Sequence, residues 1–551
     1  MRKITLAIVM MLTTLLSAQN TVNHNLEVAK QMEIFSTLYR YLDLMYVDTL
    51  NAEQVVGEGI KGMLNSLDPY TEYYPAADRK ELKSMITGKY GGIGAIITYR
   101  SKDKRSVISE PYFGMPAYEA GLRMGDVILA IDGEDMTNKQ LSYVTEHLRG
   151  NAGTSFLLKY QRPGLKEPAT VKITRQQIQM PAIPYYGMAN DSVGFISFSQ
   201  FTEDCAKLFR NAVIDLKRQG MSSLIIDLRA NTGGSLSEAV DILNLFLPKD
   251  MTLVRTRGKL PQSGREYTTS KLPIDTVMPI VALVGNMTAS ASEIMSGTLQ
   301  DLDRGVIMGT KTYGKGLVQT PIALPYNGNL KLTTAHYYIP SGRCVQAIKY
   351  KRGNNEVVAD SLKKEFKTRN GRTVKDGGGI MPDIVITPDT IPNVVYYFNS
   401  ALDSTSVLMD YVVDYVASHK TIAPARDFEI SDEDYEDFKK KAIESGFQYD
   451  RESSKLLKQL KKVAEFEGYY NRAKAEFDAL EKKLAHDLSV ELDHNKQEVK
   501  QAISSDIVAC YYYQTGVIEN SLRSDKLVQE ALSLLADKSR YHKLLYPEQK
   551  K

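Results

Sequence analysis

Two parts of the chain, roughly residues 26–86 and 399–551, place apolar residues three or four positions apart. This spacing puts apolar side chains on one face of a helix, so both parts are predicted to form amphipathic helices. In the first part the spacing is kept by Val28, Met32, Phe35, Leu38 and Leu42. In the second part it is kept by Leu456, Leu460, Val463, Tyr470, Ala473, Phe477, Leu480 and Leu484. The pattern gives no role for the C-terminal helices.

The segments between these parts alternate shorter apolar runs with polar stretches, as strands do. Residues 87–178 contain strand-like blocks around one helical piece, the pattern of a small β-rich binding module. The apolar runs VGFISF, SLIIDLR, PIVALVG and GVIMGT then alternate with helical stretches, which predicts an α/β layer structure for residues 179–398. A polar, glycine-rich insertion at about 349–379 interrupts the end of this region.

The first 20 residues, MRKITLAIVMMLTTLLSAQN, place two positive charges before an apolar run at 4–17. This is the form of a secretory signal peptide, here residues 1–18. The run is too short to span a bilayer comfortably, and no later segment has 18 consecutive apolar residues. We therefore expect an exported protein, most simply a periplasmic one. Membrane association through an uncleaved N-terminal anchor is the alternative.

The composition excludes several classes of protein. The 551 residues include 69 Lys plus Arg and 66 Asp plus Glu, and the net charge of +3 is too weak to gather nucleic acid. The three cysteines are widely spaced and form no C-x-x-C pair, so we predict no metal site and expect no cofactor. The length corresponds to roughly three or four domains with ordinary cores.

A diglycine follows the predicted strand SLIID, in the sequence DLRANTGGS. Gly233 and Gly234 allow the backbone to turn sharply and point N–H groups outward, as an anion or oxyanion site requires. A simple turn at the end of a strand is the alternative.

A serine between two alanines follows the next strand, in NMTASASEIMSG. Ser290 lies at a predicted strand-to-helix junction, where its hydroxyl is uncrowded and the helix N-terminus favours developing negative charge. Ser290 and Glu293 also match a capping box, which would explain both residues without chemistry.

A lysine between glycines follows in GTKTYGKGLVQ. Gly309 and Lys315 have nearly the spacing of a phosphate-binding loop, but Gly316 stands where a Ser or Thr must hold magnesium, and LVQTPIAL reads as a strand. A lysine packed against an apolar wall would have a lowered pKa, which suits a general base. An ordinary surface lysine is the alternative.

A glycine-rich turn precedes a strand in KYGGIGAII. Successive N–H groups in such a turn, at Ile93, Gly94 and Ala95, are able to bind a peptide C-terminal carboxylate while the strand edge pairs with the peptide.

These motifs, together and in this order, resemble the carboxyl-terminal processing proteases of peptidase family S41, serine peptidases with a PDZ domain and a serine–lysine dyad. The resemblance covers roughly residues 34–387. The matching segments are SLDPYTEYY, GKYGGIGAII, AGLRMGDVILAIDG, DLRANTGG, TASASEI, LQD, TYGKGLVQ, TTAHYYIPSGR and GIMPDIVI. It implies a ClpP/crotonase-like α/β protease core at 179–398 with an inserted PDZ domain at 87–178. N-terminal helices and a helical C-terminal extension complete this fold.

The resemblance also implies roles for single residues. Ser290 matches the nucleophile, Lys315 the general base, and Gln319 a residue that positions the lysine. The N–H of Gly233 or Gly234 would form the oxyanion hole with that of Ala291.

Supporting roles follow from the same resemblance. Glu293, Asp301 and Thr312 match positions that orient the reacting groups, and His336 is interpreted as structural. The motifs depart from the family at Thr232 and at 287–288, which affects loop geometry and no reacting group.

The resemblance implies an exported endopeptidase that cleaves protein substrates near their C-termini. The PDZ domain would recognise the free C-terminus of the substrate or gate the active site. No nucleic-acid partner is expected. A homo-oligomer or adaptor contact through the helical regions is a further expectation. The competing hypotheses are an exported binding scaffold with an inactive dyad, and a nucleotide-dependent enzyme using 309–315.

Overall fold

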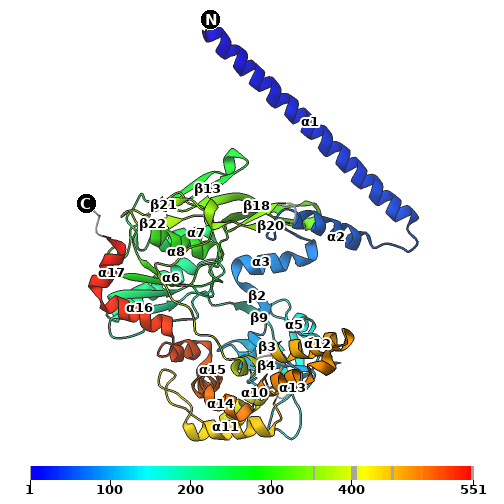
Figure 1. Ribbon diagram of the computed structural model, residues 1–551, viewed down its shortest axis with the longest axis vertical. Helices are drawn as coiled ribbons and strands as arrows, with labels where there is room; N and C mark the ends of the chain where they lie inside the picture. Colours follow the sequence, from blue (N-terminus) through cyan, green and yellow to red (C-terminus); the bar gives the residue numbers. More distant parts are fainter. Residues whose placement is uncertain (1, 352–353, 399–405, 448–451, 485–486, 548–551) are drawn as a thin grey trace. The chain divides into compact units, whose positions relative to one another are not determined.

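The structure is a computed structural model that describes residues 2–351, 354–398, 406–447, 452–484 and 487–547 (Figure 1). It divides into two compact units. Unit 1 contains Met1–Ala76, Pro321–Leu332 and Tyr350–Asn355, and unit 2 contains Ala77–Thr320, Thr333–Lys349 and Glu356–Lys551.

Unit 1 is mainly helical, with α1 (Arg2–Met45), α2 (Ala52–Asn65) and the short strand β1 (Glu72–Tyr74). The side chain of Asn51 caps α2 by accepting a hydrogen bond from Gln54 N–H (3.0 Å). β1 pairs antiparallel with the first residues of β18 (Asn329–Tyr338). The predicted apolar stripe of α1 is solvent-exposed at Val28, Met32, Phe35 and Leu38.

Within the described residues, no helix combines the length and the apolar character needed to cross a membrane.

Unit 2 begins with α3 (Arg79–Thr87) and a β-rich module, which we define as residues 89–179. Its sheet has the order β3-β4-β5-β7-β8, with β6 beside β5, and these neighbours pair antiparallel. The strands are β3 (Ala95–Arg100), β4 (Arg105–Pro111), β5 (Val127–Ile131), β6 (Glu134–Asp135), β7 (Ser155–Gln161) and β8 (Ala169–Thr174). The module also contains β2 (Lys89–Gly92) paired with β9 (Gln176–Gln179), α4 (Pro116–Glu119) and α5 (Leu141–Leu148).

The core of unit 2 is a six-stranded sheet with the order β10-β11-β12-β15-β16-β23. Its strands are β10 (Tyr185–Met188), β11 (Val193–Ser197), β12 (Ser223–Asp227), β15 (Ile280–Val284), β16 (Val306–Gly309) and β23 (Ile384–Val385). β10 is antiparallel to β11, and the other neighbours are parallel. Parallel strands need crossover connections, which here include α6 (Cys205–Arg218), α7 (Leu236–Leu243) and α8 (Ala291–Asp301).

The two faces of this sheet belong to different hydrophobic clusters. Along β12, Leu224 and Ile226 pack with α6, α7 and α8, whereas Ile225 faces the other way, as strand geometry requires. The second face is covered by α16 (Lys526–Ala536) and α17 (Lys538–Leu545), whose Val528, Ala531 and other apolar residues complete the cluster. The last helices of the chain therefore form part of the α/β core of unit 2 (Figure 1).

A second sheet contains β18, β13 (Thr252–Gly258), β14 (Arg265–Thr268) and β17 (Leu317–Ala323). The predicted insertion at 349–379 overlaps two small paired segments. These are β19 (Ile348–Lys351) with β20 (Asn354–Val357), and β21 (Glu365–Lys367) with β22 (Thr373–Lys375). The short 3₁₀ helices are η1 (Ala76–Asp78), η2 (Pro261–Ser263), η3 (Pro325–Asn327), η4 (Asp360–Leu362) and η5 (Tyr470–Arg472).

The C-terminal region is helical, as the spacing predicts. Its helices are α9 (Asn393–Phe398), α10 (Val407–Ser418), α11 (Asp432–Glu444), α12 (Glu452–Phe466), α13 (Lys474–Leu484), α14 (Leu488–His494) and α15 (Lys496–Ser521), followed by α16 and α17. The predicted start of this extension, residue 399, lies outside the described residues.

On α12 the predicted apolar stripe is not the buried face. Leu456, Leu460 and Val463 are about half exposed, whereas Leu457 and Ala464 are buried against α13. The buried face is therefore shifted by one residue, because α12 carries apolar residues on two adjoining faces and packs only one of them.

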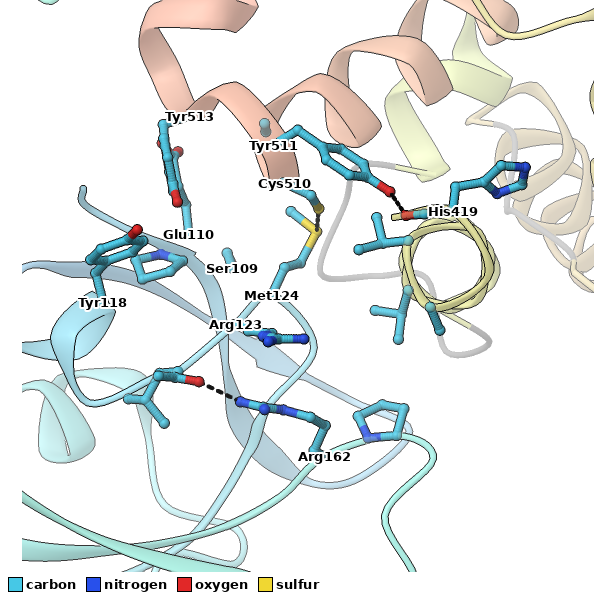
Figure 2. A pocket seen from close by; sticks show the side chains of 18 of the residues that line it. Ser109, Glu110, Tyr118, Arg123, Met124, Arg162, His419, Cys510, Tyr511 and Tyr513 are labelled. Atoms are coloured by element: carbon cyan, nitrogen blue, oxygen red, sulfur yellow. Dashed lines mark hydrogen bonds between the residues drawn. The ribbon is translucent and has the colours of Figure 1, made fainter. Parts of the chain in front are cut away.

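Residues of α10 and α15 and residues of the β-rich module line a common pocket (Figure 2). Asp410 of α10 pairs with Arg100 (3.0 Å) and Lys102 (2.7 Å). Glu110 accepts a hydrogen bond from the backbone N–H of Gln514 (2.9 Å), and burial raises the pKa of its carboxyl. Between the two parts lies a cavity of about 780 Å³.

The predicted fold class is confirmed: a layered α/β core, a β-rich module, N-terminal helices and a helical C-terminal part. The strand predicted from LVQTPIAL is present as β17. The antiparallel sheet around β13 and the placement of α16 on the core are not foreseen by the local pattern.

Candidate active site

Ser290 lies in the turn between β15 and α8, directly ahead of the helix. Its backbone has φ 56° and ψ −116°, which a non-glycine residue rarely adopts. Strain of this kind at a strand-to-helix turn exposes a side chain, as in the nucleophile elbow of serine hydrolases. The turn is fixed by the Thr288 hydroxyl, which accepts a hydrogen bond from Gly285 N–H (2.9 Å) and donates one to Leu228 O (2.8 Å).

The diglycine loop after β12 lies against this turn. Asn231 is fully buried; its amide donates to Phe198 O (2.9 Å), and its Oδ1 accepts from Gly233 N–H (2.9 Å). The same Oδ1 accepts a hydrogen bond from the Ser292 hydroxyl (2.8 Å). Gly233 has φ +103°, and a Cβ there would lie 2.8 Å from the Cβ of Ser290. Only glycine therefore fits this approach to the serine.

One backbone N–H group in the diglycine loop and one in the serine turn have no hydrogen-bond acceptor within the described residues. Because Asn231 already accepts from Gly233 N–H, the N–H of Gly234 is the one in the diglycine that has no acceptor within the described part of the chain. The N–H of Ala291, the first residue of α8, also has no acceptor within the described residues. A pair of unoccupied N–H groups next to a nucleophile is the arrangement that an oxyanion hole needs.

Lys315 lies in the segment 310–316 that connects β16 to β17, and its side chain is half-buried. Tyr313 N–H donates to Thr288 O (3.0 Å), which holds the segment to the serine turn. Gly316 N–H donates to Gln346 Oε1 (2.7 Å). Because the segment leads into a strand, it lacks the helix N-terminus of a phosphate-binding loop, which argues against the nucleotide hypothesis.

Glu293 joins the serine turn to the lysine segment. Its Oε2 accepts from the backbone N–H groups of Ser290 (3.0 Å) and Lys315 (2.8 Å). Its Oε1 accepts from Gly314 N–H (2.7 Å) and from the Thr312 hydroxyl (2.6 Å). Burial raises the pKa of the Glu293 carboxyl, and these hydrogen bonds oppose the rise. One carboxylate thus holds the backbones of Ser290 and Lys315 together.

Thr312 has a second contact that anchors this arrangement. Its hydroxyl accepts a hydrogen bond from Ile380 N–H (2.6 Å) while it donates to Glu293. The side chain is buried. The predicted supporting residues Glu293 and Thr312 are therefore in direct contact, and Thr312 belongs to the lysine segment itself.

Asp301, the third predicted supporting residue, lies at the other end of α8. Its carboxylate forms a buried ion pair with Arg343 (2.8 Å) and accepts from Ser341 N–H (3.0 Å). Burial raises the pKa of Asp301, and Arg343 opposes that rise. These contacts fix the turn at 341–343 and do not reach Ser290.

Gln319 lies on β17, where its side-chain amide donates to the Thr333 hydroxyl (3.2 Å). Its role in positioning Lys315 stays a prediction. His336 is exposed on β18, on the face opposite to Tyr337.

Two residues that contact the site were missed by sequence reasoning. Asn231 orders the diglycine loop, and the Tyr337 hydroxyl lies 2.7 Å from Lys315 O and 3.2 Å from Ser290 O. The available signal for Tyr337 was the alternation in TTAHYYIP. That alternation places it on the same strand face as the apolar residues Ala335 and Ile339.

The predicted terminus-binding loop lies at the start of β3, the edge strand of the β-rich module. Gly94 has φ +68°, and its carbonyl accepts from Tyr112 N–H (2.8 Å). The carbonyl of Ile93 accepts from Ala117 N–H (2.8 Å). Both carbonyls are therefore hydrogen-bonded within the module, and the binding of a peptide terminus by Ile93, Gly94 and Ala95 stays a prediction.

Across the described ranges, no group of three or more His, Cys, Asp or Glu residues is arranged to hold a metal ion.

Comparisons with known proteins match three parts of the chain. Models of three families match the chain: peptidase family S41 over residues 192–353, the PDZ domain over 107–162, and the probable PDZ-protease C-terminal helical domain over 398–535.

Similar proteins and a solved structure carry related names. A carboxy-terminal-processing protease of Bartonella bacilliformis is 34% identical over 332 residues, 60% of this chain and 75% of the relative. The carboxy-terminal processing protease CtpB of Bacillus subtilis is 30% identical over 333 residues, 60% of this chain and 68% of the relative. The structure of the photosystem II D1 C-terminal processing protease is 26% identical, with a TM-score of 0.37 over 65% of this chain and 88% of that one. The chain belongs to peptidase family S41, and it is a serine-type carboxy-terminal processing protease with a PDZ domain.

Proposed function

We propose that this protein is an exported endopeptidase that cleaves protein substrates near their C-termini with Ser290 as nucleophile and Lys315 as general base. The observation that supports this most strongly is the shared carboxylate of Glu293. It holds the backbone N–H groups of a strained serine and of the lysine 25 positions later in the sequence. A capping role alone explains the contact to Ser290 but not the contact to Lys315.

In the proposed reaction, neutral Lys315 accepts the proton of the Ser290 hydroxyl as the oxygen attacks the scissile carbonyl. The N–H groups of Gly234 and Ala291 stabilise the oxyanion of the tetrahedral intermediate. The ammonium of Lys315 then protonates the leaving amine, which leaves an acyl-enzyme on Ser290. Lys315 next activates a water that hydrolyses this ester, so the same amine serves as base and acid in turn.

Two variants test the dyad directly. Ser290→Ala and Lys315→Ala should each abolish peptide cleavage without changing the circular dichroism spectrum or the melting temperature by more than a few degrees. Lys311→Ala is the matched control, since it removes an exposed lysine from the same segment. Near-normal turnover by either dyad variant would contradict the assignment. If the wild-type protein binds the peptide but does not hydrolyse it, the scaffold hypothesis is favoured.

The PDZ domain is proposed to bind the free C-terminus of the substrate at Ile93, Gly94 and Ala95. Support comes from the loop geometry and from the edge position of β3, which offers a strand for the peptide to pair with. A peptide with a free C-terminal carboxylate should be cleaved with a lower KM than its amidated form. Equal KM values for the two peptides would argue against capture by this loop.

We also propose that residues 1–18 act as a cleaved signal peptide that directs the protein to the periplasm. The charged and apolar pattern of the first 20 residues supports this proposal. N-terminal sequencing of the protein recovered from cells should begin at Gln19. A start at Met1 in a membrane fraction would support the anchor alternative instead.

A homo-oligomer formed through α1 is a further part of the proposal. The stripe of Met32, Phe35 and Leu38 is exposed, and a second copy of the chain would cover it with the same stripe. Phe35→Glu should lower the mass of the particle measured in solution. Ala29→Glu, which adds the same charge at an exposed position outside the stripe, should leave that mass unchanged. An unchanged mass in both variants would show that α1 does not form the interface.

A further inference from the structure

The backbones of Ser290 and Lys315 are held from two sides. Glu293 accepts hydrogen bonds from the N–H groups of both residues, at 3.0 and 2.8 Å. At the carbonyl groups of the same two residues, the Tyr337 hydroxyl donates toward both oxygens, at 2.7 Å from Lys315 O and 3.2 Å from Ser290 O. Glu293 thus binds the N–H groups of Ser290 and Lys315, and Tyr337 binds their carbonyl groups.

The position of Tyr337 is set by elements that are themselves well anchored. The residue lies on β18, where it pairs with Thr256 of β13, and its N–H donates to Gly316 O (3.0 Å), directly after the lysine. Its ring is buried in the hydrophobic cluster that also contains Ile339 and Ile380. The hydroxyl has little freedom to move, so it fixes the distance between the two carbonyls that it contacts.

The hydroxyl remains a donor over the working pH range. Burial raises the pKa of Tyr337 well above the usual value for tyrosine, and the carboxylate of Glu293 raises it further. A phenol that stays protonated keeps its proton directed toward the carbonyl oxygens. The short contact to Lys315 O identifies the lysine as the main acceptor, with Ser290 O as the second.

We propose that Tyr337 is a positioning residue for the reaction: its hydroxyl sets the relative placement of the Ser290 and Lys315 backbones and so the geometry of proton transfer between their side chains. The inference rests on the proposed Ser290–Lys315 dyad. Tyr337 itself contacts no reacting atom. Because proton transfer and attack depend on alignment within fractions of an ångström, loosening this link should slow the chemical step about 10- to 100-fold.

The test is Tyr337→Phe in the full-length protein, which removes the hydroxyl and keeps the ring. We expect kcat to fall about 10- to 100-fold, KM to stay within about twofold, and the acid limb of the pH profile of kcat/KM to move. Tyr338→Phe is the matched control, because the neighbouring side chain faces the other way and stacks with Arg257. The control should leave all three quantities unchanged.

A second pair of variants separates the hydrogen bond from packing and from a folding defect. Tyr337→4-aminophenylalanine keeps a donor at the ring position, and Tyr337→4-methylphenylalanine has nearly the same shape without one. The amino variant should recover most of kcat, and the methyl variant should not. Equal activity of these two variants, or unchanged kcat and pH profile in Tyr337→Phe, would overturn the inference.

The failure of this inference is distinguishable from failure of the dyad. If Ser290→Ala and Lys315→Ala are inactive while Tyr337→Phe behaves as wild type, the dyad stands and only the positioning role is lost. If either dyad variant retains normal turnover, the proposed function itself is wrong.

Discussion

At Glu293 one buried carboxylate accepts four hydrogen bonds, and two of the donors belong to the residues proposed to react. A capping box predicted the contact from Glu293 to Ser290. The contacts to Thr312, Gly314 and Lys315 depend on a segment more than 18 residues away, and no local pattern contains them. The residue is therefore best understood as a link between two loops.

Replacing Glu293 by Gln should weaken this link. The amide nitrogen of Gln would face backbone N–H donors, so at least one buried hydrogen bond is lost and a donor is left unsatisfied. We expect Glu293→Gln to lower the free energy of unfolding by about 2–4 kcal/mol and kcat by tenfold or more. Urea unfolding and steady-state kinetics measure the two effects, with Glu203→Gln at an exposed site as control. Wild-type stability in Glu293→Gln would contradict the description of this contact.

Asp506 of α15 makes stability depend on pH. Burial raises the pKa of its carboxyl to about 7, whereas the unfolded chain has the usual value near 4. The folded protein therefore holds a proton that the unfolded chain releases, and the stabilisation is complete below about pH 4 and lost as the pH rises through about 7.

Asp506→Asn removes this titration. The variant should gain stability relative to wild type at pH 8, by up to about 4 kcal/mol, and show little difference at pH 4. Melting temperatures measured across this range test the sign. An equal effect at both pH values would mean that the carboxyl does not titrate in this way.

Among elements, α16 shows how the end of the chain contributes to the site. Asp525 caps this helix through Leu527 N–H (3.0 Å) and Val528 N–H (3.2 Å), and it also pairs with Arg229 (2.7 Å). Arg229 lies two residues before Asn231, in the loop that carries the diglycine. A helix cap is thereby connected to the candidate oxyanion hole.

Asp525→Ala should weaken both the helix and the loop. We expect a loss of about 1–3 kcal/mol in the free energy of unfolding, together with a lower kcat. Asp537→Ala is the control, since Asp537 caps α17 through Arg540 N–H (2.9 Å) and has no ion pair to this loop. Asp537→Ala should lower the free energy of unfolding. Its kcat, calculated per folded molecule, should equal that of the wild type. Equal kcat values in the two variants would show that α16 has no influence on the active site.

At the scale of elements, the sequence predicted the type of each helix or strand better than it predicted which elements pack together. The apolar runs before Ser290 and before the diglycine indicated strands, because buried parallel strands are continuously apolar. The packing of Val528 against β15 and β16 joins residues more than 200 positions apart, which no periodicity contains. The same limit explains the shifted face of α12 and the missed contacts of Tyr337 and Asn231.

On the scale of the whole molecule, the helical region limits the freedom of the PDZ domain. Asp410 of α10 pairs with both Arg100 and Lys102 of the domain, and α15 contacts it at Glu110. A tethered domain keeps a bound C-terminus at a high effective concentration near the protease core.

Asp410→Ala should loosen this attachment. We expect a higher KM for peptides with a free C-terminus, no change in kcat, and faster hydrogen exchange in 95–111. Asp414→Ala, on the same helix and largely exposed, should change neither quantity. Unchanged exchange in Asp410→Ala would show that the ion pairs do not hold the domain.

The central claim, that Ser290 is a nucleophile activated by Lys315, is tested most directly by mass-spectrometric mapping of the residue that a fluorophosphonate reagent labels in the full-length protein. The reagent should modify Ser290 alone, and labelling should be absent in Ser290→Ala and at least 100-fold slower in Lys315→Ala, since an unactivated serine is a weak nucleophile. Labelling of another serine, or an unchanged rate in Lys315→Ala, would contradict the account.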